Sequence, residues 1–145
     1  MPSDAAPDTI RLVVPSTPLA VREALCGLFH SPALRHLPET ERGTAEIVLA
    51  EVLNNIVEHA YAGSSGEIEV MIRIASGALT CTIVDHGGQL IGQMPPPDRP
   101  PARLALADLP EGGFGWHLIR TLTSDLDYRR IGPRNELSFR LIAEQ

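Results

Sequence analysis

Two periods of hydrophobic and polar positions occur along the chain, and together they predict its helices and strands. β-Branched residues and alternation predict strands over Ile10–Val14, Glu67–Ile74 and Ala78–Val84. Two closing strands are predicted around the turn Gly-Pro-Arg-Asn, over Leu126–Ile131 and Glu136–Ile142. Apolar residues at helical spacing predict helices over Pro18–Phe29, Glu39–Tyr61 and Trp116–Ser124. Ser16 or Thr17 supplies a cap for the first helix, and Gly63 closes the second.

The order of these elements predicts the fold class. One strand, two helices, two strands, a loop, a helix and two strands fit a sheet of about five strands, mostly antiparallel, with about three helices covering one face. This is a two-layer α/β sandwich. The length of 145 residues suits a single domain over residues 1–145, and 43% hydrophobic residues are enough to form its core.

Net charge and the absence of targeting signals disfavour several classes of function. The chain has 12 basic and 18 acidic residues, for a net charge of −6, which disfavours nonspecific binding to nucleic acid or to a membrane surface. The sequence starts without an apolar leader and has no stretch of about 18 apolar residues. We therefore expect a cytoplasmic protein, with Cys26 and Cys81 as buried free thiols.

All 12 basic residues are arginine, so a bound phosphate would be held by arginine, by backbone N–H groups or by a metal. The second helix offers candidate chemistry. At about 100° per residue its last turns place one set of polar residues on one side: Glu51, Asn54, Asn55, Glu58 and His59. A solvated face is the simpler interpretation, but asparagine has modest helix propensity and is unusual there. A carboxylate, an amide and an imidazole in one row suit Mg²⁺ that takes its other ligands from water and phosphate.

Two glycine-containing segments add to this pattern. Asp85-His86-Gly87 ends a strand on a carboxylate that can accept from the exocyclic amine of a base. The 26 residues His86–Glu111 contain six prolines and three glycines, which predicts a long loop, either a lid over residues 86–112 or a surface insertion. Gly112-Gly113-Phe114-Gly115 then opens the third helix, where backbone N–H groups can bind an anion.

The three motifs occur in a recognisable order: Glu51-x-x-x-Asn55-x-x-x-His59-Ala60-Tyr61, then Asp85-x-Gly87, then Gly112-Gly113-Phe114-Gly115. This order resembles the N, G1 and G2 boxes of the ATPase superfamily that joins gyrase, chaperone, histidine-kinase and mismatch-repair ATP sites. The compact length and the closing segment 135–139 look most like the anti-sigma factor serine kinases of bacterial partner-switching systems. The resemblance covers roughly residues 20–141 and implies the Bergerat-type ATP-binding fold.

The resemblance implies a role for each matched residue. Asn55 would bind the Mg²⁺ that bridges the phosphates of ATP, and Glu51 would be the general base for the attacking hydroxyl. Asp85 would accept the adenine amino group, and Gly87 would shape the turn beside it. The other residues expected at the nucleotide are His59, Ala60, Gly112, Gly113, Phe114, Gly115 and Ser138.

The leading hypothesis is therefore an ATP-dependent serine/threonine protein kinase that phosphorylates a small antagonist protein and also acts as an anti-sigma factor by sequestering a sigma factor or similar regulator. A homodimer is expected from the same resemblance. Two alternatives remain: a partner switch that binds nucleotide but transfers little phosphate, and a protein of this fold that binds no nucleotide. Glu51 favours the kinase, because a pure binding module needs no base beside the metal.

Overall fold

A computed structural model of the protein describes residues 8–75, 78–88 and 114–142. The elements follow the predicted order over this part of the chain: β1 (Asp8–Pro15), α1 (Pro18–Phe29), α2 (Glu39–Asn55), η2 (Ile56–Ala60), β2 (Glu67–Ala75), β3 (Ala78–Asp85), α4 (Phe114–Leu122), β4 (Ser124–Ile131) and β5 (Arg134–Ile142). None of the helices in these ranges is both long enough and apolar enough to cross a bilayer.

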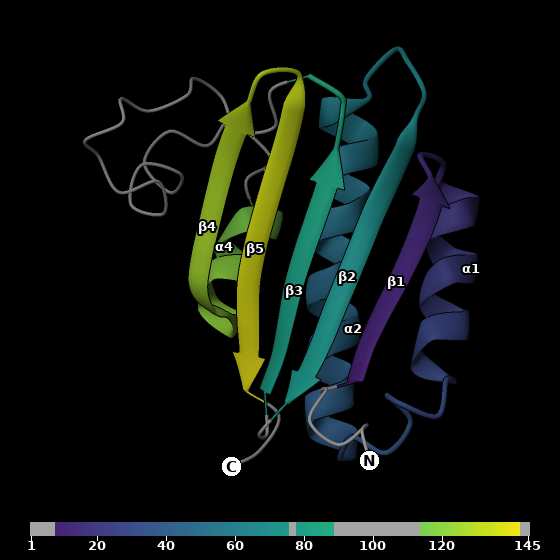
Figure 1. Ribbon diagram of the computed structural model, residues 1–145, viewed down its shortest axis with the longest axis vertical. Helices are drawn as coiled ribbons and strands as arrows, with labels where there is room; N and C mark the ends of the chain where they lie inside the picture. The colour runs from purple at the N-terminus through teal and green to yellow at the C-terminus, as the bar shows by residue number, and fades with distance from the viewer. Residues whose placement is uncertain (1–7, 76–77, 89–113, 143–145) are drawn as a thin grey trace, which may run out of the picture.

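The strands form one five-stranded sheet in the order β1-β2-β3-β5-β4, and every neighbouring pair is antiparallel. In Figure 1 the helices α1, α2 and α4 lie behind the sheet, and its other face is turned toward the viewer without a helix over it. The predicted two-layer sandwich is confirmed.

The core lies between the sheet and the helices, and strand alternation explains why. In β2, Ile68, Val70 and Ile72 are buried, whereas Glu67 and Glu69 are exposed on the opposite face. From the other layer, α2 contributes buried residues at helical spacing: Ala45, Val48, Leu49, Val52 and Leu53. The sheet therefore presents one apolar face to the helices and one mixed face to solvent.

Two local signals in the sequence act as expected, and one boundary moves. Thr17 caps α1, because its Oγ1 accepts a hydrogen bond from the Ala20 N–H at 3.1 Å. The β4–β5 hairpin turns on Gly132 and Pro133 alone, with Gly132 at φ +59°, a conformation that favours glycine. Strand β5 consequently begins at Arg134, two residues before the predicted start at position 136.

The two cysteines differ from the expectation of two buried thiols. Cys81 on β3 is fully buried, and burial raises the pKa of its thiol to about 12. Cys26 is exposed, which corrects the prediction for this residue. The buried residues of α1 include Val21 and Leu28, seven positions apart on one face, whereas Cys26 is about 140° away from Val21 around the helix.

The second helix is not continuous in the way the sequence predicts. Instead of one α-helix to Tyr61, α2 ends at Asn55 and a single π-helical turn, η2, follows. Its wider ring is closed by the Tyr61 N–H, which donates to the Ile56 carbonyl at 3.0 Å. Because a π turn holds an extra residue, the expected row through Glu51, Asn55 and His59 does not persist: Asn55 is buried and His59 is exposed.

Candidate functional site

The end of η2 and the turn after β3 meet at one end of the sandwich, in close backbone contact. The Gly88 N–H donates to the Ala60 carbonyl at 2.6 Å. A Cβ added to Gly87 would lie 2.4 Å from the same carbonyl oxygen, so only glycine fits at this position. The structure thus brings together Ala60 and Gly87, two residues that the sequence assigns to separate motifs.

Tyr61, for which the sequence predicted no role, connects two strands at this end of the sandwich. Its ring is buried, and its hydroxyl donates to the Glu67 carbonyl at 2.7 Å and accepts from the His86 N–H at 3.0 Å. The start of β2 and the residue after β3 are therefore held by one side chain. Gly66 lies against the same ring, where a Cβ would approach the phenol atoms to within 2.6–2.9 Å.

Asp85 is the last residue of β3, and its side chain has one satisfied and one free oxygen. The residue is only 1% exposed. Its Oδ1 accepts from the Gly87 N–H and from the Asn135 Nδ2, both at 2.8 Å. Its Oδ2 is buried and has no partner among the described residues. Burial raises the pKa of Asp85, and the two hydrogen bonds together with the charges of Arg130 and His86 oppose that rise.

Asn135 on β5 is the second functional candidate that sequence reasoning missed, because it was assigned to the hairpin turn. It lies opposite Asp85 in the β3–β5 register and is 1% exposed. Its Nδ2 donates to Asp85 and to the Gly88 carbonyl at 2.7 Å, while its Oδ1 accepts from the Tyr128 hydroxyl at 2.6 Å and from Arg130 at 3.2 Å. The amide is fully satisfied, and it anchors Asp85.

On α2, Asn55 and Glu51 lie one turn apart at the same end. Asn55 is 9% exposed, and its Nδ2 is buried without a partner among the described residues. Glu51 is half-buried. The described residues contain no group of three or more His, Cys, Asp or Glu side chains placed to hold a metal. A single amide oxygen suits Mg²⁺, which commonly keeps several waters and takes further ligands from phosphate.

The structure places the other predicted residues as follows. His59 is exposed, and its Nε2 lies 4.0 Å from the Glu58 carboxylate at the surface of η2. Phe114 and Gly115 form the first turn of α4. Gly112 and Gly113 lie outside the described residues, as does the expected lid apart from residues 86–88.

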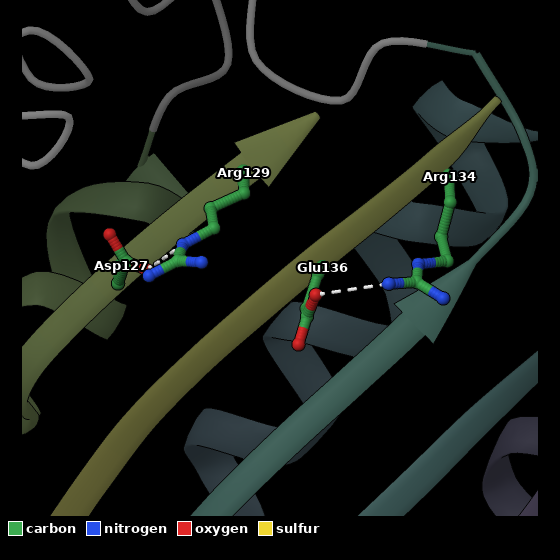
Figure 2. A network of polar contacts seen from close by, with 4 residues as sticks. All are labelled: Asp127, Arg129, Arg134 and Glu136. Atoms are coloured by element: carbon green, nitrogen blue, oxygen red, sulfur yellow. Dashed lines mark hydrogen bonds and ion pairs between the residues drawn. The ribbon is translucent and has the colours of Figure 1, made fainter. Parts of the chain in front are cut away.

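Ser138 does not join the other site residues. It lies between two buried residues of β5, so its side chain faces the helix-free side of the sheet. One cross-strand neighbour is Asp127, whose carboxylate pairs with Arg129 at 3.0 Å beside the Arg134–Glu136 pair at 3.5 Å (Figure 2). Asp85 and its partners face the helices, so Ser138 is on the wrong face to support them.

Comparison with known proteins now adds to this geometry. A family model described as "Histidine kinase-like ATPase domain" matches residues 14–141. Proteins named serine-protein kinase RsbW from Bacillus cereus and Bacillus anthracis are 31% identical over 86 residues, which cover 56% of this chain and 52% of theirs. The chain thus spans about half the length of these relatives.

A solved structure gives an independent match to the fold. The RsbU and RsbW domains of Rv1364c from Mycobacterium tuberculosis superpose with a TM-score of 0.66 at 16% identity, over 95% of this chain and 33% of that one. At this level of identity the likeness concerns the fold alone, and it agrees with the five-stranded antiparallel sheet and its helical layer.

Proposed function

Because the chain belongs to the histidine kinase-like ATPase family, we propose that it binds Mg²⁺-ATP at the end of the sandwich where η2 meets the turn after β3. The observation that carries this proposal is that two of the three buried side-chain polar atoms without partners among the described residues, Asp85 Oδ2 and Asn55 Nδ2, belong to predicted site residues; the third is Arg134 Nε. Such atoms are uncommon in proteins and costly unless a ligand satisfies them.

Asp85 recognises the base. Its Oδ1 already holds two hydrogen bonds, so the free Oδ2 is the acceptor for the exocyclic amino group of adenine. Gly87 keeps the turn close to Ala60, and its N–H holds the other oxygen of the carboxylate. This arrangement supports adenine over a base that offers no donor at that position.

Asn55 and Glu51 act at the phosphate end. The Asn55 Nδ2 makes no hydrogen bond to a described residue that would have to be broken if the amide rotated, so the amide oxygen can turn toward a ligand. When bound, Mg²⁺ would neutralise phosphate charge, and Asn55 would be the protein ligand that holds it. Glu51, one turn earlier, orients the attacking hydroxyl and accepts its proton. Backbone N–H groups of residues 112–115 and the first turn of α4 would bind phosphate oxygens.

The reaction that fits these roles is transfer of the ATP γ-phosphate to a serine or threonine hydroxyl of a protein. The sequence similarity to the serine-protein kinases named RsbW supports this substrate class. We extend it to an antagonist protein as phosphate acceptor, to a sigma factor or analogous regulator as the sequestered partner, and to a homodimer in the cytoplasm. The single-domain organisation and the lid over residues 86–112 are parts of the same proposal.

Phosphate transfer from [γ-³²P]ATP to candidate antagonist proteins tests the proposal. Glu51→Gln is expected to lower the transfer rate about 10²- to 10⁴-fold, because the carboxylate can no longer accept the proton, while the Kd for Mg²⁺-ATP stays within about threefold. Glu58→Gln is the matched control, since Glu58 is an exposed residue on η2. Its transfer rate is expected to equal that of the wild type.

Two results would contradict the assignment. If the Glu51→Gln protein transfers phosphate at the wild-type rate, Glu51 is not the general base. A wild-type protein that binds Mg²⁺-ATP but phosphorylates no antagonist favours the nucleotide-dependent partner switch. If calorimetry detects no nucleotide binding, the protein has the fold of this family without its ligand.

A further inference from the structure

A hydrogen-bonded network on β4 and β5 fixes the orientation of one amide behind Asp85. The Asn135 Oδ1 accepts from the Tyr128 hydroxyl and from Arg130 Nη1, at 2.6 and 3.2 Å. A guanidinium has no acceptor, so an amide turned the other way would point its NH₂ group at Arg130, donor against donor. The orientation in which Asn135 Nδ2 faces Asp85 Oδ1 and the Gly88 carbonyl is therefore fixed from both sides, by these two acceptors and by the donor Arg130.

Arg130 holds the turn as well as the amide. Its Nη1 also donates to the Gly87 carbonyl at 2.7 Å, across 43 residues of sequence. The two backbone carbonyls of the turn, those of Gly87 and Gly88, are thus bound by β4 and β5 respectively. The carboxylate of Asp85 and the turn that follows it are positioned by one set of side chains.

The network also determines which oxygen of Asp85 is free. With Oδ1 occupied by Asn135 and by the Gly87 N–H, only Oδ2 remains for a ligand. Burial raises the pKa of Asp85, and the Asn135 hydrogen bond and the charge of Arg130 both act in the opposite direction. An ionised carboxylate only accepts hydrogen bonds, so it distinguishes a ligand that donates from one that does not.

We propose that Asn135 and Arg130 are positioning residues that set base selectivity: they present Asp85 Oδ2 as a fixed acceptor that selects purines bearing an exocyclic amino group. The inference rests on the proposed function, which places that amino group on Oδ2. Neither residue touches the base. Their effect reaches the ligand through the carboxylate, so it appears as a change in selectivity rather than as a uniform loss of affinity.

The test compares the Kd of ATP with that of purine riboside triphosphate, which carries hydrogen in place of the amino group, by calorimetry with Mg²⁺. A hydrogen bond to a charged group predicts a wild-type preference for ATP of about 10- to 100-fold. Asn135→Ala is expected to reduce this preference to within about threefold, mainly by weakening ATP, and Arg130→Met to reduce it at least about threefold. A purely structural role would weaken both ligands equally and leave the ratio unchanged.

Matched variants separate the possible failures. Arg129→Met makes the same chemical change on the neighbouring residue of β4, which is exposed and pairs with Asp127, and it is expected to keep the full preference. If Asn135→Ala does not fold in a thermal melt, Arg130→Met gives the answer, because its aliphatic stem is retained. A wild type without preference overturns the base contact of Asp85 and this inference with it. A wild-type preference that Asp85→Asn abolishes, but that the folded Asn135 and Arg130 variants retain, overturns the inference alone.

Discussion

The two ends of the proposed nucleotide site are built in different ways. At the base end, Asp85 and Asn135 lie opposite each other in adjacent strands, and their hydrogen bonds leave a single acceptor free. At the phosphate end, Glu51 and Asn55 project from one helix, and the buried Asn55 Nδ2 has no partner among the described residues. In the proposed site, the base end is therefore formed by the fold itself, whereas the phosphate end would be completed by the ligand.

This difference follows from the elements that carry the residues. Cross-strand register fixes side chains from two or three strands against each other, and a buried network of this kind is rigid once every member is satisfied. A helix end has no such lateral partner, and the π turn after Asn55 widens the backbone at that point. The protein is therefore expected to bind the nucleoside part of its ligand in a preformed site and to order the phosphate end on binding.

The largest expected effect is a change in ligand affinity that distinguishes the base end from the phosphate end. Asp85→Asn replaces the free acceptor with an NH₂ group that faces the adenine amino group, so the Kd for ATP and for adenosine should both rise about 100-fold, equivalent to roughly 2.8 kcal/mol. Asn55→Ala should weaken Mg²⁺-ATP and leave adenosine unchanged, because it acts through the metal. Calorimetry with both ligands measures the contrast, and equal losses in Asn55→Ala would remove the division into two ends.

A smaller effect tests how tightly the base end is packed. Gly87→Ala drives a Cβ to 2.4 Å from the Ala60 carbonyl oxygen, whereas a Cβ at Gly88 would lie 3.6 Å from the same oxygen, its nearest neighbour among the described residues. The backbone must shift to make room for the Cβ at position 87, so we expect Gly87→Ala to lower the free energy of unfolding by about 2 kcal/mol. The neighbouring Gly88→Ala should change it by less than about 0.5 kcal/mol.

Urea unfolding of the two variants without nucleotide gives both values. Equal stabilities for Gly87→Ala and Gly88→Ala would mean that the turn can move away from η2 at little cost, and the base end would then be as adaptable as the phosphate end.

The sequence predicted the base end only in part, for a physical reason. The fold class, the element order and the residues Asp85 and Gly87 follow from periodicities and motifs that are local in sequence. Asn135 was assigned to a turn because its role depends on cross-strand register, which local patterns do not specify. Ser138 was expected at the site, but side chains three positions apart on a strand point to opposite faces of the sheet. The side chain on the same face as Asp85 is therefore that of Asn135.

The phosphate end shows the complementary limit. A helical wheel at a constant 100° per residue predicts one row of Glu51, Asn55 and His59, and the π turn ends that row at Asn55. The turn is followed directly by Tyr61, whose hydroxyl bonds to Glu67 and His86, residues that are distant from one another in sequence. A tertiary contact of this kind can alter helical register without leaving a signal in the helix itself.

The smallest expected effect concerns the free acceptor when no ligand is present. Because burial raises the pKa of Asp85 in the folded protein, its contribution to stability is complete below the unfolded-state pKa of about 3.9 and is lost as pH rises through the folded-state value. At neutral pH the ionised side chain therefore lowers stability. Asp85→Asn keeps an oxygen for Asn135 and removes the charge, so without nucleotide it should be more stable than the wild type by about 1 kcal/mol at pH 7.

That advantage should shrink as the pH falls and vanish near the unfolded-state pKa, where the wild-type carboxyl is also neutral. Urea unfolding across pH 4–8 measures the trend, with the exposed residue Glu58 changed to Gln as the background. An Asp85→Asn protein that is less stable than the wild type at pH 7 would show that the carboxylate supports the fold. The unpaired Oδ2 would then not lower the stability of the ligand-free protein. The base end would be ordered by Asp85 itself rather than by the side chains that hydrogen-bond to it.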